Sequence, residues 1–93
     1  MMDKRMEAVV YGRVQGVSFR FFTEREANRL QLSGWVANQF DGTVRVVAEG
    51  PETQLDKFIS FLHRGSPSAW VERVAIDWTE ATGEFTGFKV RRI

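Results

Sequence analysis

The order of two apolar spacings along the chain constrains its fold more than any other feature. Some segments alternate apolar and polar residues, as half-buried β-strands do, and others repeat apolar residues every three or four positions, as amphipathic helices do. Strands are predicted for residues 6–11, 34–39, 43–49, 74–78 and 88–93, and helices for residues 21–32 and 51–64. The predicted order is therefore strand, helix, strand, strand, helix, strand, with a fifth strand at the end.

This order is typical of an α+β sandwich, in which two helices cover one face of a mostly antiparallel sheet. In a βαββαβ sheet the first and third strands are central neighbours, and the second strand lies beside the third. A chain of 93 residues is long enough for one hydrophobic core. We therefore expect a single domain over residues 1–93, with residues 1–5 as a flexible tail.

The composition excludes several kinds of site and partner. The chain has no cysteine, so disulfides, thiolate metal sites and cysteine nucleophiles are ruled out. Its 13 basic and 12 acidic side chains leave a net charge of +1, which disfavours nucleic acid as a partner. No apolar run approaches the roughly 18 residues of a membrane helix, and the start MMDKRM lacks the apolar core of a signal peptide. We expect a cytoplasmic protein with no membrane partner.

The two predicted helices carry boundary and packing signals. Thr23 and Glu26 have the spacing of a capping box in the first helix, and Pro51 suits the first turn of the second. The second helix has an apolar stripe at i, i+3, i+4 and i+7 that is expected to be buried, namely Leu55, Phe58, Ile59 and Leu62.

The stretch GRVQGVSFR, residues 12–20, joins the first strand to the first helix. A helix N-terminus leaves backbone N–H groups unpaired at the positive end of the helix dipole, and a loop wrapped around it suits a phosphate. Gly16 can adopt a positive φ, and Arg20 adds a guanidinium that can donate two parallel hydrogen bonds to phosphate. Taken alone, however, an ordinary turn with a surface arginine is the commoner explanation of such a loop.

The stretch GWVANQFDGTV, residues 34–44, places Asn38 at a strand end, just before a hairpin turn that contains Asp41. Taken alone, these two side chains are most simply turn residues. The segment is not the Asp-x-Asp-Gly-Thr motif of haloacid-dehalogenase-like phosphatases, because Gln39 stands where their nucleophilic aspartate is required.

Together, the two stretches resemble the motifs of the acylphosphatase family. The family's first motif, G-x-V-Q-G-V-x-F-R, is met at every fixed position in residues 12–20, and its second, G-W-V-x-N-x-x-D-G-x-V, at every fixed position in residues 34–44. Phe88 and Val90 match a terminal F-x-[IV] strand, so the resemblance covers residues 6–93. The ending RRI departs from the pattern, which has an aromatic residue near the end.

The resemblance implies a ferredoxin-like fold and hydrolysis of the carboxyl–phosphate bond of small acyl phosphates. It implies no metal, no other cofactor and no phosphoenzyme, with inorganic phosphate as product and inhibitor. Arg20 corresponds to the family's phosphate-binding arginine, and Asn38 to its water-positioning asparagine. The implied phosphate-binding residues are Gln15, Gly16, Val17, Ser18, Phe19 and Arg20. We expect the enzyme to be a monomer.

Two other functions fit the predicted fold. A domain of this kind could hold phosphate or an acyl-phosphate intermediate for a partner without hydrolysing it, although the presence of both Arg20 and Asn38 favours catalysis. RNA-recognition domains share the βαββαβ order. The near-neutral charge and the lack of an aromatic platform on the third predicted strand, TVRVVAE, argue against that function.

Overall fold

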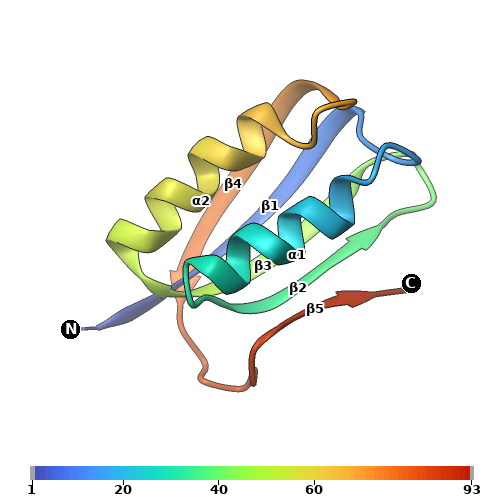
Figure 1. Cartoon of the computed structure of the whole chain (residues 1–93). Coiled ribbons are helices and arrows are strands. Elements are labelled where there is room, and N and C mark those ends of the chain that lie inside the picture. The colour runs from blue at the N-terminus through green and yellow to red at the C-terminus, as the bar shows by residue number, and fades with distance from the viewer. Residues whose placement is uncertain (1, 93) are drawn as a thin grey trace.

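The structure is a computed structural model that describes residues 2–92; Met1 and Ile93 lie outside the described residues. The elements follow in the order β1 (Asp3–Arg13), α1 (Phe19–Arg29), β2 (Ser33–Asn38), β3 (Val44–Pro51), α2 (Glu52–Arg64), β4 (Trp70–Glu80) and β5 (Phe88–Arg91). The predicted order βαββαβ with an additional C-terminal strand is therefore confirmed (Figure 1). The connectivity is that of a ferredoxin-like fold.

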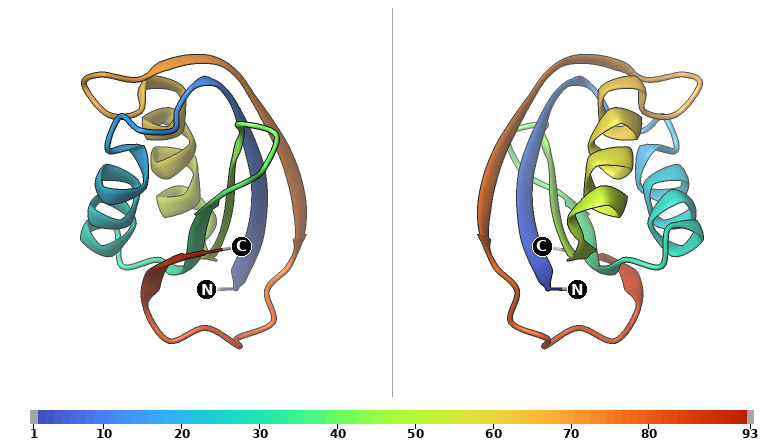
Figure 2. Two further views of the ribbon diagram at one scale, coloured as in Figure 1. Left: turned by 90° about the vertical axis from the view of Figure 1, so that its right-hand side faces the viewer. Right: turned by 90° about the vertical axis from the view of Figure 1, so that its left-hand side faces the viewer.

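The five strands form one sheet in the order β4-β1-β3-β2-β5, with both helices on one face (Figure 2). As predicted, β1 and β3 are central neighbours and β2 lies beside β3, in antiparallel pairs. The sheet is nevertheless mixed, because β5 runs parallel to β2. The reason is geometric. The connection after β4 runs past the lower ends of the strands in Figure 1 to the other edge of the sheet. Strand β5 therefore starts at that end and runs in the same direction as β2.

The expectation of a flexible tail over residues 1–5 is wrong for residues 3–5, which form the first part of β1. Lys4 is paired with Gly50 of β3 on one side and with Glu80 of β4 on the other. Because successive residues bond alternately to the two neighbouring strands, both neighbours pair the backbone of this segment, which local sequence patterns do not reveal.

The predicted cap of the first helix is also wrong. Helix α1 begins at Phe19 and its N-cap is Ser18, in the left-handed region at φ 61°. Thr23 is buried in the middle of the helix. Glu26 bonds to the Arg29 guanidinium instead of reaching back to a cap. The N-cap at Ser18 lies five residues before Thr23, the N-cap that the capping-box spacing predicts.

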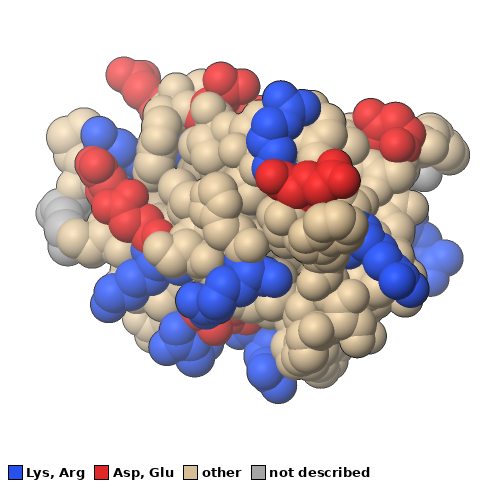
Figure 3. All heavy atoms as spheres, turned by 90° about the horizontal axis from the view of Figure 1, so that it is seen from above, with Lys and Arg blue, Asp and Glu red and all other residues tan. Residues whose placement is uncertain are grey.

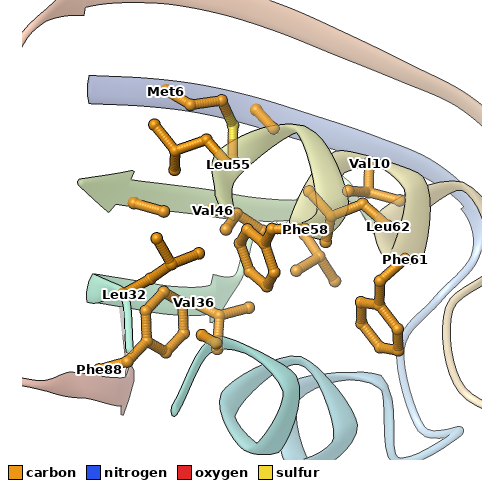
Figure 4. Close-up of a cluster of buried hydrophobic side chains, with 14 of the residues drawn as sticks. Met6, Val10, Leu32, Val36, Val46, Leu55, Phe58, Phe61, Leu62 and Phe88 are labelled. Carbon is orange, nitrogen blue, oxygen red and sulfur yellow. The ribbon is translucent and has the colours of Figure 1, made fainter. Parts of the chain in front are cut away.

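The hydrophobic core lies between the helices and the sheet (Figure 4). Alternate residues of β1 and β3 point into it, and the predicted helix stripe supplies the other side with one change. Ile59 is only partly buried, and Phe61 is buried in its place, with its ring stacked on Phe58 at 6.4 Å. Each large side chain buried here contributes about 1.5–3 kcal/mol relative to exposure.

The surface and the helices show two further properties. In the view of Figure 3, basic and acidic side chains are interspersed, and neither sign covers the face. Neither α1 nor α2, the helices in residues 2–92, is long and apolar enough to cross a membrane.

Candidate active site

The β1–α1 loop contains two glycines that serve different purposes. Gly12 lies where the register between β1 and β4 shifts, at φ 128°, and a Cβ there would clash with the carbonyl oxygen of Trp70. Gly16 has φ 72°, and a Cβ there would meet no neighbouring atom. Gly12 is therefore required by the close approach of a strand, whereas Gly16 is required only by the backbone conformation of the turn.

The N–H groups of residues 15–18, named the cradle below, belong to a tightly turned backbone. The φ angles at Gly16 and Ser18 are positive, at 72° and 61°, while Val17 between them is not in the positive region. Turns that contain left-handed residues form concave anion-binding sites in many proteins. Within residues 2–92, the N–H groups of residues 15–18 have no backbone acceptor. The cradle is thus a set of donors held ready at the start of a helix.

Three hydrogen bonds from two side chains hold the loop in this shape. The Gln15 amide Nε2 donates to the carbonyl oxygens of Gln39 at 2.7 Å and Thr43 at 2.9 Å. The buried Ser66 hydroxyl donates to the Val17 carbonyl oxygen at 2.6 Å. The loop is therefore tied to the β2–β3 turn on one side and to the α2–β4 connection on the other.

Arg20 is the second residue of α1, so its side chain leaves the helix beside the cradle. No ion pair or side-chain hydrogen bond within residues 2–92 engages its guanidinium. Its donors are available to an anion that is already held by the loop N–H groups.

Asn38 is the last residue of β2, where strand alternation places it on the same face as the buried Val36. That is the helix-covered face, and Asn38 and Arg20 line the same hollows at its edge. The amide oxygen Oδ1 of Asn38 is buried and accepts no hydrogen bond from any described residue. A buried acceptor without a partner costs free energy, and an active site is a common reason for it.

The turn that follows Asn38 is internally bonded. The Thr43 N–H and hydroxyl donate to Asp41 Oδ1 at 3.0 and 2.6 Å, and Gln39 Nε2 donates to the Thr43 hydroxyl at 2.9 Å. The two bonds from Thr43 to Asp41, of which the one from the hydroxyl has the larger effect, hold the pKa of the exposed Asp41 carboxyl below its usual range. The turn is thereby stiffened, and it carries both Asn38 and the two carbonyls that bind Gln15.

Two adjoining hollows open beside these residues. The loop-side hollow has a volume of about 490 Å³ and is lined by Val14, Gly16, Ser18, Phe19, Arg20, Phe21, Glu24, Asn38, Val90 and Arg92. The arginine-rich hollow has a volume of about 410 Å³ and is lined by Gln15, Arg20, Asn38, Gln39, Phe40, Arg91 and Arg92. Arg20, Asn38 and Arg92 line both. The left view of Figure 2 faces this end of the molecule, where the β1–α1 loop, the β2–β3 turn and the end of β5 all lie toward the viewer.

Comparison with known proteins places these features in a family. The acylphosphatase family model matches residues 6–90. The chain belongs to the acylphosphatase family. An acylphosphatase from Salinibacter ruber is 51% identical over 90 residues, which are 97% of this chain and 95% of that protein. Such a match over nearly the full length of both proteins makes the chain an enzyme of this class.

Solved structures agree with this assignment. The crystal structure of acylphosphatase from Bacillus subtilis is 36% identical, with a TM-score of 0.92, and the match covers 95% of this chain and 98% of that one. The fold also matches part of a longer protein, HypF of T. kodakarensis. There the TM-score is 0.84 at 31% identity, over 97% of this chain and 12% of that chain.

Most of the residues predicted from the acylphosphatase motifs come together at the hollows. Gln15, Gly16, Ser18, Phe19, Arg20 and Asn38 line one or both of them. Val17 lines neither, because its side chain packs against the core. Phe19 is also buried, so its side chain anchors the start of α1. The functional roles of these residues remain predictions.

The structure adds residues that the motifs did not indicate. Val90 and Arg92 reach the hollows from β5 and the residue that follows it, and Glu24 does so from α1. The match of Val90 to a terminal strand was visible in the sequence, but the place of that strand beside β2 was not. Among residues 2–92, no three His, Asp or Glu side chains are grouped so that they could hold a metal ion.

Proposed function

We propose that the chain hydrolyses the carboxyl–phosphate bond of small acyl phosphates, giving a carboxylate and inorganic phosphate by in-line attack of water. One observation carries this proposal: Arg20 and Asn38, from different elements, line the same two hollows beside a cradle of N–H donors. Such a site needs no acid for the leaving group, since a carboxylate leaves without protonation. Its task is to hold the phosphoryl group and to place a water.

The cradle and Arg20 would bind the phosphoryl group. N–H groups of residues 15–20 and the Arg20 guanidinium face the charge that develops on the three equatorial oxygens. One preorganised donor of this kind contributes about 3 kcal/mol to transition-state stabilisation. An arginine on a transferring phosphoryl group contributes about 10³-fold or more in rate. The bonds from Gln15 and Ser66 support this role, because they fix the loop before substrate arrives.

Asn38 would orient the attacking water. Its amide does not titrate, so it acts as an acceptor. The unpartnered Oδ1 accepts a hydrogen bond from the water, and this directs a lone pair of the water oxygen toward phosphorus. We propose that the proton passes to the phosphate itself. Glu24 is the one carboxylate that lines the loop-side hollow within the described residues. If it took the proton instead, Glu24→Gln would lose kcat as severely as Asn38→Ala does.

The test is hydrolysis of benzoyl phosphate by the purified chain. We expect turnover without added metal, resistance to a chelator, inhibition by inorganic phosphate and loss of nearly all activity in Arg20→Ala. Full activity in Arg20→Ala would refute the assignment of the site. A bell-shaped pH–rate profile with a near-neutral essential group on the free enzyme would refute the proposed route of the proton.

The match to a curated acylphosphatase over nearly the full length of both proteins argues against the second function considered from the sequence, in which the domain holds phosphate or an acyl phosphate for a partner without turnover. Thermal stabilisation by phosphate, together with no hydrolysis of benzoyl phosphate, would support that second function. The expectations of a monomeric, cytoplasmic protein that needs no cofactor and binds no nucleic acid remain predictions.

A further inference from the structure

The two hollows differ in the charges that line them. The loop-side hollow contains the apolar side chains of Phe21 and Val90, which are 58% and 38% exposed, and the carboxylate of Glu24. The arginine-rich hollow contains three arginines and no acidic residue. Arg20 and Arg92 line both hollows, but in the first Glu24 opposes them, whereas in the second Arg91 adds to them. An anionic group on a bound molecule would therefore be attracted more strongly in the second hollow.

Arg91 and Arg92 contribute to this contrast unequally. Arg91 is the last residue of β5, and Arg92 follows it outside the strand. The Arg91 guanidinium lies over the rings of Trp35 at 5.1 Å and Phe85 at 5.8 Å, which holds it toward the open face of the sheet. Arg92 has no such contact and no ion pair within residues 2–92, is exposed, and lines both hollows together with Arg20.

We propose that the arginine-rich hollow binds the acyl part of the substrate and that Arg92 selects acyl groups with a second negative charge. This inference rests on the proposed function, since it assumes that the phosphoryl group lies in the cradle. A guanidinium binds carboxylates and phosphates alike through paired N–H donors, so the shared chemistry is an anionic oxygen group. The ring of Phe40, which is 95% exposed at the edge of the hollow, offers an apolar surface to the carbon skeleton.

The inference makes Arg92 a determinant of specificity and leaves the chemistry to other residues. An exposed ion pair contributes up to about 1 kcal/mol, so preference for the charged acyl group should be about fivefold. The preference should also weaken with added salt, because exposed charges are screened beyond about 8 Å at 0.15 M ionic strength.

The experiment compares kcat/KM for matched substrates: 3-carboxybenzoyl phosphate and its neutral isostere 3-carbamoylbenzoyl phosphate, with 3-phosphonobenzoyl phosphate as a third arm. The readout is the ratio of charged to neutral substrate within each enzyme, so a general loss of activity cancels. We expect a ratio of about five in the unaltered chain, close to one in Arg92→Gln, below one in Arg92→Glu, and partly restored in Arg92→Lys. The phosphono arm shows whether a phosphate-like group or a carboxylate is preferred.

Lys57→Gln is the matched control, because Lys57 is an exposed cation on α2 that lines neither hollow. It should keep the ratio of the unaltered chain. A ratio near one in the unaltered chain, or one that Arg92→Gln and Arg92→Glu leave unchanged, would overturn the inference. Hydrolysis of benzoyl phosphate with its dependence on Arg20 would then still stand. Loss of that dependence would instead remove the proposed function.

Discussion

At the end of the sheet where β3 finishes, the side chain of Glu49 is 3% exposed and its carboxylate is surrounded by donors. The N–H and hydroxyl of Thr82 donate to it at 3.0 Å, the N–H of Gly83 at 2.9 Å, and Arg5 at 3.2 Å. At the opposite end, the β1–α1 loop and Arg20 offer the same kinds of donor, but no carboxylate of the described chain occupies them.

The two ends thus use one chemistry for two purposes. At the Glu49 end an anion belongs to the chain, and loop N–H groups and an arginine hold the fold together around it. At the Arg20 end the donors have no acceptor among residues 2–92, and we propose that they bind an anion from solution. The difference teaches that donor type alone does not mark an active site. What marks it is that the donors are fixed in place and have no acceptor within the protein.

The comparison is tested most severely by removing one arginine from the Arg20 end. Arg20→Ala should lower kcat on benzoyl phosphate by about 10³-fold or more, equivalent to about 4 kcal/mol. It should also abolish stabilisation by inorganic phosphate, measured as the rise in Tm with phosphate concentration. Arg5→Ala, at the other end, should lower Tm and leave the response to phosphate in place. The same loss of phosphate response in both variants would show that the two ends are not separate.

Asn38 separates water placement from phosphate binding within the Arg20 end. Asn38→Ala should lower kcat by about 10²-fold, the cost of losing one preorganised polar group at the transition state. Because Asn38 is not proposed to bind the phosphoryl group, the inhibition constant of inorganic phosphate should change little. Loss of phosphate inhibition in this variant would contradict the proposed division of roles.

Glu49 tests the structural end. Glu49→Gln keeps the shape of the side chain but places an NH2 group opposite donors, so we expect a loss of about 2 kcal/mol in the free energy of unfolding. For a domain of this size, that corresponds to a fall of about 10 °C in Tm. Denaturant unfolding at neutral pH measures the first quantity and calorimetry the second. The kcat of the folded variant should stay within about twofold, since the site lies at the other end.

The same carboxylate predicts a pH dependence of stability. Burial disfavours the charged form of Glu49, but the bonds from Thr82, Gly83 and Arg5 outweigh it and hold the pKa below its usual range. A lowered pKa in the folded state gives stability that is present above the ordinary glutamate pKa and is lost as the pH falls through the folded value. The difference in stability between the unaltered chain and Glu49→Gln should therefore shrink in acid. A constant difference from pH 7 to pH 3 would exclude this explanation.

The smallest effect is expected from Gln15, whose side chain holds the β1–α1 loop against the β2–β3 turn. Gln15→Leu removes two hydrogen bonds from the side chain of residue 15 to the β2–β3 turn. The looser loop should bind phosphate more weakly, so the apparent dissociation constant for phosphate should rise several-fold. Each bond contributes about 1 kcal/mol, so the free energy of unfolding should fall by about 1–2 kcal/mol. Comparison of phosphate inhibition with urea unfolding distinguishes a looser loop from a general loss of stability.

The order of elements and the pairing of the central strands could be predicted from the sequence because they follow from local periodicity and general topology. The ends of elements could not. Asp3 belongs to β1 because Pro51 pairs with it, and Phe61 replaces Ile59 in the core because of how α2 rests on its neighbours. Both depend on contacts between segments far apart in the chain.

The candidate site shows the same limit. Arg20 and Asn38 were found because two motifs of unusual length contain them. The bonds by which the Gln15 side chain holds the loop were not predicted, because their acceptors are backbone carbonyls that any residue type could supply. Glu49 occupies a polar position of an alternating strand, and its donors come from a later loop. The residue types alone did not indicate that Glu49 would contact Thr82 and Gly83.

The parallel arrangement of β5 and β2 has a practical consequence for anyone handling this enzyme. It brings Arg92 to the mouth of both hollows, whereas Asp3 begins β1 at the far end of the sheet (Figure 1). A purification tag or fusion partner on the C-terminal side of Arg92 would follow a residue that lines both hollows and could crowd or charge the site proposed for substrate. An addition on the N-terminal side of Asp3 would follow from the other end of the sheet. Kinetic work on acyl-group preference should therefore use N-terminal tags.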